Sequence, residues 1–592
     1  MATIDRRVNV QRGKGRRIQP YAWLGAGAVT LGLGAAMAGG AAIAHADDGS
    51  EAGKSGVSHS QSSDSSSKAS RAAKHSTPSS AASGSAARKA PKNSGSDTAE
   101  AGDTTAPAAT AVSGIAGNST SSHTSAVRSA AATVTAQPAA PDTSVAPSSA
   151  SIPDPNQGQF IPKTITPGAH VILAQDQISA AQKALNQTTW GQGNILGGLA
   201  SIAPQVLLSS ASFQLSAWQS LNPVAQSLVA GTAGIPIIHQ IAQVSLLGTM
   251  LLPALSQGSL KGAALLMPVV GIFAPAATTL ASPLIAQATS NGRVYGVIRL
   301  RQYNTTEPLL DASINGSSKQ ALLVDTGSSG LVIDQANAGT LDPANRIATG
   351  QKGSFSGGFD YTYDTYENTT VDFGNGVVSD PTYVNVVTSG TYNGQPYTLE
   401  QFLSAAGAAG ILGVGANAQG PGPSPIPTST LPGELSDGML IYQSLLPLGL
   451  GGFVVFGPNP LPPKATLSGT PTSTINVSIN GGAQQSVVSI IDSGGVYGTI
   501  PNDILAGTPG TYAPSGTRIS VYTPDGKTLL YSYTTGSAPY APTIVGPTDQ
   551  PTKGNYLNTG NYAFKQGPVY VDYRNDGVYD NGGYGWTVFD IA

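Results

Sequence analysis

The chain has 592 residues, a net charge of −3, and charged side chains at only 10% of its positions, and this length exceeds that of one ordinary domain. It contains no Cys, which excludes disulfides, thiol chemistry and Cys-ligated metals. No His follows His239, so the C-terminal half cannot hold a Ser-His-Asp unit or a His-ligated zinc, and carboxylate chemistry remains among the common hydrolytic mechanisms. That half is also net acidic, so we expect no nucleic-acid partner.

Residues 1–46 are predicted to be a signal peptide. Basic residues precede an apolar stretch over residues 21–43, and Ala44-His45-Ala46 has the small-residue pattern of a cleavage site. An uncleaved membrane anchor is the alternative interpretation. Either way, we expect the protein to be secreted or held in the cell envelope or at the cell surface.

Residues 47–158 are predicted to be a disordered linker. This segment is rich in Ser, Ala and Thr and has almost no large apolar side chain, so it cannot bury a core. A glycosylated stalk and a bare spacer both fit this composition.

Residues 159–290 form an apolar segment that is nearly free of charge and is predicted to be helical. Proline is expected to break it into short helices, because proline removes a backbone donor and disfavours a helix interior. One interpretation is an element that associates with cell-envelope lipid. The other, which the prolines favour, is a helical module that packs on itself or on the next domain.

From residue 291 onwards the pattern changes to short apolar strands separated by turns. Asn-Gly or Asp-Gly pairs occur at 315–316, 393–394, 480–481 and 525–526. These pairs are typical of tight hairpin turns, and a stretch of about 300 residues suits a large two-lobed β-protein.

Two similar motifs carry the chemistry. Asp325-Thr326-Gly327-Ser328 and Asp492-Ser493-Gly494-Gly495 each follow an apolar strand, and each strand is preceded by the sequence Ser-Ile-Asn-Gly, at 313–316 and 478–481. This match indicates an internal duplication whose halves face each other. Two carboxylates that close cannot both ionise, so they share a proton and supply an acid and a base at one place.

The chain resembles the pepsin-like aspartic proteases over residues 290–592, and more narrowly the aspartic protease domain of mycobacterial PE/PGRS proteins. The resemblance is carried by the two Asp motifs with their flanking strands and by Gly410-Ile-Leu-Gly-Val-Gly, while Asn558-Thr-Gly-Asn is similar to the mycobacterial group. It implies a mainly β, two-lobed domain over 291–592 with a lobe boundary near 460–472.

The resemblance also implies roles for the motif residues. Asp325 and Asp492 would be the catalytic pair. Supporting roles would fall to Thr326 and Ser493, which bond across the lobe interface, to Gly327 and Gly494, which allow close backbone approach, and to Ser328, which bonds Asp325. Gly495 stands where many such enzymes carry a hydroxyl, so we expect Asp492 to lose one hydrogen bond and the two carboxyls to ionise differently.

Pepsin-like enzymes cover the substrate with a hairpin that bears a Tyr. The candidate hairpin has its tip at Gly357-Gly358, and Tyr361 is the first choice for this flap residue, followed by Tyr363. Ordinary cross-strand packing of the Tyr side chains is the alternative.

The predicted function is therefore an exported aspartic endopeptidase that hydrolyses cell-envelope or secreted proteins, with itself as one candidate substrate. The implied chemistry needs no cofactor and no metal. We expect a monomeric protease domain, because both half-sites lie in one chain. The alternative is a catalytically silent surface or adhesion protein on the same scaffold.

Overall fold

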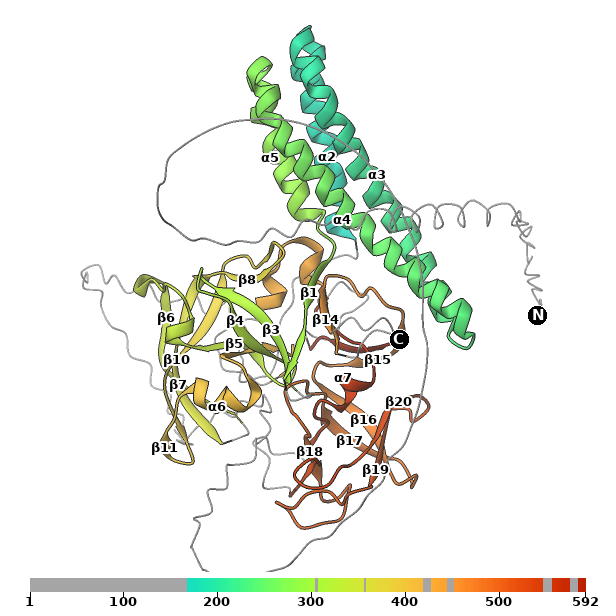
Figure 1. The fold of residues 1–592 in the computed structure, drawn as a ribbon, viewed down its shortest axis with the longest axis vertical. Coiled ribbons are helices and arrows are strands. Elements are labelled where there is room, and N and C mark those ends of the chain that lie inside the picture. Colours follow the sequence, from blue (N-terminus) through green and yellow to red (C-terminus); the bar gives the residue numbers. More distant parts are fainter. Residues whose placement is uncertain are drawn as a thin grey trace, which may run out of the picture. The chain divides into compact units, whose positions relative to one another are not determined.

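The computed structural model describes residues 168–591 except 304–306, 356–357, 419–426, 444–451, 547–555 and 575–583. The predicted signal peptide, the predicted linker and the first residues of the predicted helical segment lie outside the described residues. The described part begins with helices and continues with β-strands, as the sequence predicts (Figure 1).

Four α-helices make up the first part of the described chain. α3 packs along α4, and α2 packs along α5. Buried apolar side chains recur every three or four residues, as in Val171, Ala174 and Ile178 of α2, which places them on one face of each helix. The helices are α2 (Ala169–Thr188), α3 (Ile195–Thr232), α4 (Pro236–Phe273) and α5 (Pro275–Asn291).

The prediction that proline breaks this segment into short helices is wrong for most of its length. α3 and α4 have 38 residues each, with Pro204 and Pro223 inside α3 and Pro253 and Pro268 inside α4. An interior proline costs roughly 3 kcal/mol in an isolated helix. Here the two helices share a long apolar contact that offsets this cost, since tertiary packing supplies most helical stability in proteins.

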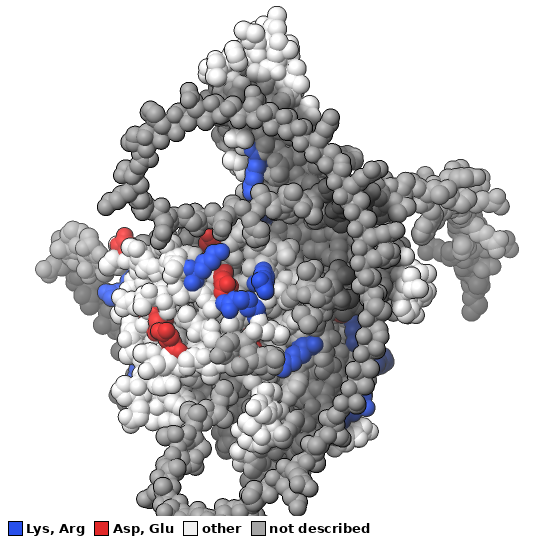
Figure 2. Space-filling model, in the orientation of Figure 1, with Lys and Arg blue, Asp and Glu red and all other residues white. Residues whose placement is uncertain are grey.

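α3 and α4 also expose many large apolar side chains on the faces turned away from that contact. Among the described helices, these two are long and apolar enough to cross a membrane, judged by length and composition alone, which is weak evidence. On the face of the whole molecule that Figure 2 shows, charged side chains of both signs are scattered among uncharged ones. The exposed positions repeat at helical spacing and include Ile195, Leu199, Ile202, Val206 and Phe213 of α3, and Ile237, Ile241, Val244, Leu251 and Leu255 of α4.

The first large sheet has eleven strands and contains the first Asp motif. Its order is β6-β7-β10-β5-β12-β4-β3-β8-β9, with β11 on β10 and β2 on β3. Its strands are β2 (Arg301–Tyr303), β3 (Glu307–Ile314), β4 (Gln320–Asp325), β5 (Ser329–Asp334), β6 (Arg346–Phe355), β7 (Phe359–Thr369), β8 (Val371–Gly374), β9 (Val377–Val378), β10 (Thr382–Tyr392), β11 (Gln395–Pro396) and β12 (Gly410–Val414). A short helix, α6 (Leu399–Leu403), precedes β12.

A seven-stranded sheet contains the second Asp motif, in the order β20-β19-β16-β17-β22-β18-β21. Its strands are β16 (Thr472–Ile479), β17 (Gln485–Ile490), β18 (Thr499–Pro501), β19 (Arg518–Tyr522), β20 (Leu529–Thr534), β21 (Thr543–Val545) and β22 (Tyr556–Asn558). A six-stranded sheet combines strands from both ends of the domain, in the order β1-β14-β13-β23-β24-β15. These are β1 (Gly296–Arg299), β13 (Gly438–Tyr442), β14 (Phe453–Phe456), β15 (Pro463–Ser468), β23 (Val569–Asp572) and β24 (Trp586–Asp590), and α7 (Tyr562–Gln566) precedes β23.

The two Ser-Ile-Asn-Gly sequences form matching hairpins. Asn315 and Gly316 join β3 to β4 with φ angles of 47° and 76°, and Asn480 and Gly481 join β16 to β17 with φ angles of 52° and 76°. Two successive positive φ angles define the tight hairpin turn that Asn-Gly favours. In both copies the Ser hydroxyl donates to a main-chain carbonyl four residues later, at 2.5 Å and 2.7 Å.

The strand that leads into each Asp has the same kind of neighbour. β4 lies parallel to β12, and β17 lies parallel to β22. Each Asp motif therefore sits beside a parallel strand that comes from much later in the chain. This arrangement brings residues 410–414 to the first motif and residues 556–558 to the second.

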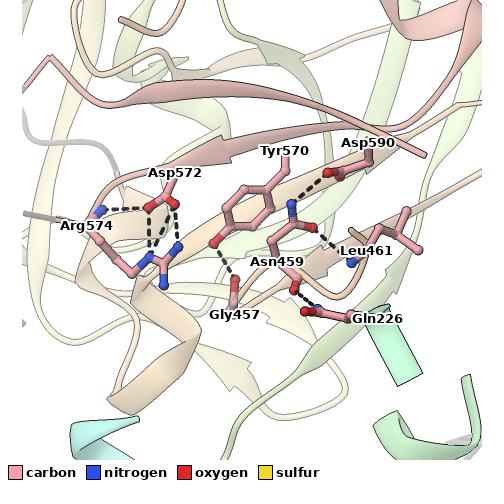
Figure 3. A network of polar contacts seen from close by, with 8 residues as sticks. All are labelled: Gln226, Gly457, Asn459, Leu461, Tyr570, Asp572, Arg574 and Asp590. Carbon is pink, nitrogen blue, oxygen red and sulfur yellow. Dashed lines mark hydrogen bonds and ion pairs between the residues drawn. The ribbon is translucent and has the colours of Figure 1, made fainter. Parts of the chain in front are cut away.

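Hydrogen bonds join the helices to the β-strands. The amides of His170 and Val171 donate to Glu434 Oε1 at 3.0 and 3.3 Å, where a carboxylate suits the positive end of α2. Figure 3 shows a second junction, in which Gln226 of α3 donates to the carbonyl of Asn459 at 2.9 Å. Asn459 in turn donates to Asp590 at 2.8 Å.

Candidate active site

Asp325 and Asp492 are both fully buried at the ends of apolar strands. Asp325 is the last residue of β4, and Asp492 follows β17 after Ile491. Neighbouring strands cover the backbone on both sides of each approach, which fixes the point where each chain turns. The sequence therefore delivers each carboxyl to a defined position.

The structure brings the two motifs into contact. The carboxyl groups of Asp325 and Asp492 lie close enough for each to act on the pKa of the other. The backbone at Gly327 passes so close to the second carboxyl that a Cβ there would lie 2.7 Å from Cγ of Asp492. Real Cβ atoms do not approach other atoms so closely, so this loop needs glycine at position 327.

Thr326 and Ser493 bind each other's loops. Thr326 Oγ1 donates to the carbonyl of Ile491 at 2.6 Å and accepts from the amide of Ser493 at 2.9 Å. Ser493 Oγ donates to the carbonyl of Val324 at 2.7 Å and accepts from the amide of Thr326 at 3.0 Å. Four buried hydrogen bonds thus hold the two Asp loops together.

Each carboxyl accepts from the backbone amide two residues further on and from one side-chain donor. Asp325 accepts from the Gly327 amide at 2.8 Å and from the Ser328 hydroxyl at 2.6 Å. Asp492 accepts from the Gly494 amide at 2.9 Å and from Asn558 Nδ2 at 2.7 Å. The two half-sites therefore share this pattern, although the side-chain donor to Asp492 is an amide and the Gly495 amide adds a further donor there.

The expectation that Asp492 loses a hydrogen bond because of Gly495 is wrong. Asn558 at the end of β22 supplies that bond, and a Cβ at position 495 would lie 2.7 Å from Asn558 Oδ1. Sequence reasoning missed this residue because its role depends on the parallel pairing of β22 with β17, which local patterns do not reveal. Asn558-Thr-Gly-Asn stood out in the sequence only as part of the resemblance to the mycobacterial group.

Burial raises the pKa of both carboxyls, and their neighbours act on them differently. The pKa of Asp325 lies well above its ordinary value, because of burial first and the charge of Asp492 second. Burial also raises the pKa of Asp492, but hydrogen bonds from Asp325 and Asn558 and from two backbone amides oppose that rise. Burial and mutual repulsion therefore favour a state in which the pair as a whole holds one proton.

The predicted flap hairpin is formed by β6 and β7, with Gly358 at a φ of 88° beside the turn. Tyr361 is only 3% exposed, and its ring stacks against Phe355 and Phe359. Its hydroxyl is buried without a hydrogen-bond partner in the described part of the chain. Tyr361 thus packs in an apolar cluster, as the alternative interpretation expects, and a flap role for it remains a prediction.

Neither motif comes with a set of metal ligands. Within the described residues, no group of three or more His, Cys, Asp or Glu side chains is placed to hold a metal ion. The chemistry available at the site is that of a buried pair of carboxyls that holds one proton and one negative charge.

Residues 296–580 match the sequence family described as the PE-PGRS C-terminal aspartyl peptidase-like domain. Two curated relatives are both called PE cleavage protein A. The one from Mycobacterium tuberculosis is 42% identical over 312 residues, and the one from Mycobacterium marinum is 33% identical over 316 residues. The matches cover 50% of this chain and 51% and 52% of the relatives, so the chain spans about half the length of the curated relatives it matches.

Among solved structures, the chain is similar to an aspartic proteinase from Irpex lacteus, with 15% sequence identity and a TM-score of 0.33. That match covers 50% of this chain and 97% of the Irpex lacteus chain.

Proposed function

We propose that the protein is an aspartic endopeptidase, because residues 296–580 match the family described as the PE-PGRS C-terminal aspartyl peptidase-like domain. One observation carries this proposal: two fully buried carboxyls, Asp325 and Asp492, meet where four hydrogen bonds join the loops of two matching hairpins. Such a pair holds an acid and a base within reach of one bound water, which is what peptide hydrolysis requires.

The proposed reaction uses the asymmetry of the pair. Charged Asp492 takes a proton from the attacking water while the water oxygen forms a bond to the peptide carbonyl carbon. Protonated Asp325 gives its proton to the carbonyl oxygen, which yields a neutral tetrahedral gem-diol. Asp492 then passes its proton to the amide nitrogen as the C–N bond breaks, and Asp325 regains its proton from a gem-diol hydroxyl as the new carboxyl forms.

The other motif residues hold this geometry. Thr326 and Ser493 hold the two loops together through four hydrogen bonds. Gly327 lets the first loop approach the carboxyl of Asp492, and the amide of Gly494 donates a hydrogen bond to that carboxyl. Ser328 holds Asp325 from the other side.

Replacement of either aspartate tests the proposal. Asp325→Asn and Asp492→Asn keep the shape of the site and remove its acid–base pair, so each is expected to abolish cleavage of casein between pH 3 and 7. Asp590→Asn is the matched control, because Asp590 is also buried and bonded to an Asn but lies on β24. Persistent cleavage in either site variant would overturn the proposal.

The alternative of a catalytically silent scaffold rested on the missing hydroxyl at Gly495. Asn558 replaces that donor, which removes the only feature of the sequence that favoured the alternative. A statine-containing inhibitor, whose hydroxyl mimics a hydroxyl of the tetrahedral gem-diol, distinguishes the two functions. The protease is expected to bind it at acidic pH, and a silent scaffold is not.

We further infer that the substrates are proteins of the cell envelope or secreted proteins. The name of the curated relatives describes a protein that cleaves PE proteins, and this makes PE-type proteins the first candidates, together with the chain itself. Incubation of purified full-length protein, followed by mass spectrometry of its termini, tests self-cleavage. The Asp325→Asn protein serves as the control, since only an autocatalytic cut disappears in it.

The exposed apolar faces of α3 and α4 support association with envelope lipid. Five exposed side chains on α3 (Ile195, Leu199, Ile202, Val206 and Phe213) repeat at helical spacing. Replacement of Ile202, Val206 and Phe213 by Ser is expected to reduce co-sedimentation of the full chain with phosphatidylglycerol vesicles. Unchanged co-sedimentation would rule out this face as the lipid contact.

A further inference from the structure

We propose that Asn558 is a positioning residue of the Asp325–Asp492 pair, whose side-chain amide takes the place of the hydroxyl missing at position 495 and keeps the negative charge on Asp492. This inference deepens the proposed protease function and rests on it. Asn558 acts through Asp492 and is therefore not itself a catalytic residue.

The orientation of the Asn558 amide is fixed by its two ends. Nδ2 donates to Asp492 Oδ2 at 2.7 Å, and Oδ1 accepts from the amide of Gly560 at 2.8 Å. A flipped amide would place Oδ1 against a carboxylate oxygen and Nδ2 against an N–H group, and both contacts would be repulsive. Asn558 is 4% exposed, so water does not compete for these bonds.

Position 495 and Asn558 occupy the same space. A Cβ on Gly495 would lie 2.7 Å from Asn558 Oδ1 and 2.7 Å from Asp492 Oδ2. A side chain at 495 and the amide of Asn558 therefore exclude each other in the present backbone. Gly495 leaves room for the amide of Asn558, so the glycine at 495 and the asparagine at 558 depend on each other.

The segment that follows Asn558 holds it against the second motif. The amide of Thr559 donates to the carbonyl of Ile490 at 2.9 Å, and Asn561 Nδ2 donates to the carbonyl of Ser493 at 2.7 Å. Thr559 Oγ1 also accepts from the amide of Asp492 at 3.3 Å. Bonds on both sides of Asp492 thus fix the distance between Asn558 and the carboxyl.

The NH₂ group of an amide differs from a hydroxyl because it cannot accept a hydrogen bond. The Nδ2 group only donates, whereas the hydroxyl of Ser328 can donate or accept. Asn558 therefore stabilises Asp492 Oδ2 only while that oxygen carries no proton. Ser328 can serve Asp325 in either state, so the proton is free to stay on Asp325. This difference makes the two half-sites chemically unequal.

The acid limb of the pH profile of kcat/KM tests the role, since it reports ionisation of the base in the free enzyme. Asn558→Ala in the full-length protein removes a donor that favours the charged form of Asp492. The acid limb is then expected to move to higher pH, and kcat/KM at the wild-type optimum to fall about 10- to 100-fold, as expected for loss of a hydrogen bond to a charged group. An unshifted acid limb would overturn the proposal.

A swap of donors provides the second measurement. Gly495→Ser alone is expected to lower kcat/KM, because its side chain collides with Asn558. The double variant Gly495→Ser/Asn558→Ala removes the collision with Asn558 but keeps the close approach of Cβ to Asp492 Oδ2, so it is expected to regain only part of the activity, above the Gly495→Ser variant. If the double variant is no better than the worse single variant, Asn558 does not stand in for a hydroxyl.

Asn561→Ala separates positioning from general support of the loop. It removes the buried bond to the carbonyl of Ser493 but touches neither carboxyl. We expect it to lower the stability of the protein without moving the acid limb. An acid limb that shifts as far in Asn561→Ala as in Asn558→Ala would overturn the proposal, since loosening of the loop would then explain both.

The proposed protease function and this inference can fail separately. If the wild-type chain cleaves no protein and binds no statine-containing inhibitor, the proposed function fails. The carboxyl ¹³C signal of Asp492 in uniformly Asp-labelled protein then still reads out the inference: its titration is expected to move to higher pH in Asn558→Ala. If the wild type is active and neither readout moves, the inference alone fails.

Discussion

Thr326 and Ser493 exchange hydrogen bonds in both directions across the junction of the two Asp loops. Each hydroxyl donates to the carbonyl of the residue just before the opposite Asp, Ile491 or Val324, and each accepts from the backbone amide of the other residue, over 2.6–3.0 Å. Both side chains are at most 1% exposed to solvent. These bonds connect the eleven-stranded sheet to the seven-stranded sheet, so the separation of the carboxyls depends on them.

Thr326→Val is expected to destabilise the protein and to reduce catalysis. The change keeps the shape of the side chain but leaves the carbonyl of Ile491 and the amide of Ser493 without their partner. Two unsatisfied buried groups cost about 2–4 kcal/mol together. Guanidinium denaturation measures this loss, and Thr340→Val, at an exposed Thr, is the control. An equal effect in both variants would show that the cross-loop bonds add nothing.

The sequence predicted the two hairpins that end in Asp325 and Asp492 because its signals are local and repeated. The Asn-Gly turns and the apolar runs that end in Asp325 and Asp492 define hairpins without reference to the rest of the chain. Asn558 could not be predicted in the same way. It reaches Asp492 across 66 positions of sequence through a parallel strand pair, and its contribution becomes clear only when the space above Gly495 is known.

The helices illustrate the opposite error. From the sequence, each proline is expected to interrupt a helix. This expectation held for Pro236 and Pro275, which lie in the first turn of α4 and α5. It failed for Pro204 and Pro253, which are buried inside long helices. The free energy of the helix–helix contact decided the outcome there, and that contact cannot be read from one segment alone.

Gly327→Ala is expected to abolish the proposed peptidase activity while the fold persists. The new Cβ would stand 2.7 Å from the Asp492 carboxyl, so the two loops would have to separate. A displacement of about 1 Å at a reacting group costs on the order of 100-fold in rate, which sets the expected fall in kcat/KM.

Gly248→Ala in α4 is the matched control for that substitution, because nothing lies within 4 Å of its Cβ position. It is expected to keep full activity, and Ala favours a helix over Gly. Retention of wild-type kcat/KM in Gly327→Ala would contradict the close approach of the two loops.

Tyr361→Phe is expected to stabilise the protein by about 1 kcal/mol, because it removes a buried hydroxyl that has no partner in the described structure. Tyr573→Phe should have the opposite effect, since the Tyr573 hydroxyl donates to the carbonyl of Val414 at 2.8 Å. Thermal unfolding of the two variants measures the contrast. A fall in kcat/KM for Tyr361→Phe without a gain in stability would instead support the flap role predicted from the sequence.

Stability is expected to decrease as the pH rises from mildly acidic to neutral. Burial raises the pKa of Asp437 and of Asp590 well above the ordinary range, so the folded state binds these protons more tightly than the unfolded state does. The stability that they contribute is complete below the unfolded carboxyl pKa of about 3.9 and is lost as the pH rises through the folded pKa, at about 1.4 kcal/mol per pH unit for each proton. Asp590→Asn keeps an acceptor for Asn459 but cannot ionise, so it is expected to flatten this slope by about one proton. Denaturation at a series of pH values from 4 to 7 measures the slope, and equal slopes in wild type and variant would mean that Asp590 does not hold a proton in the folded protein.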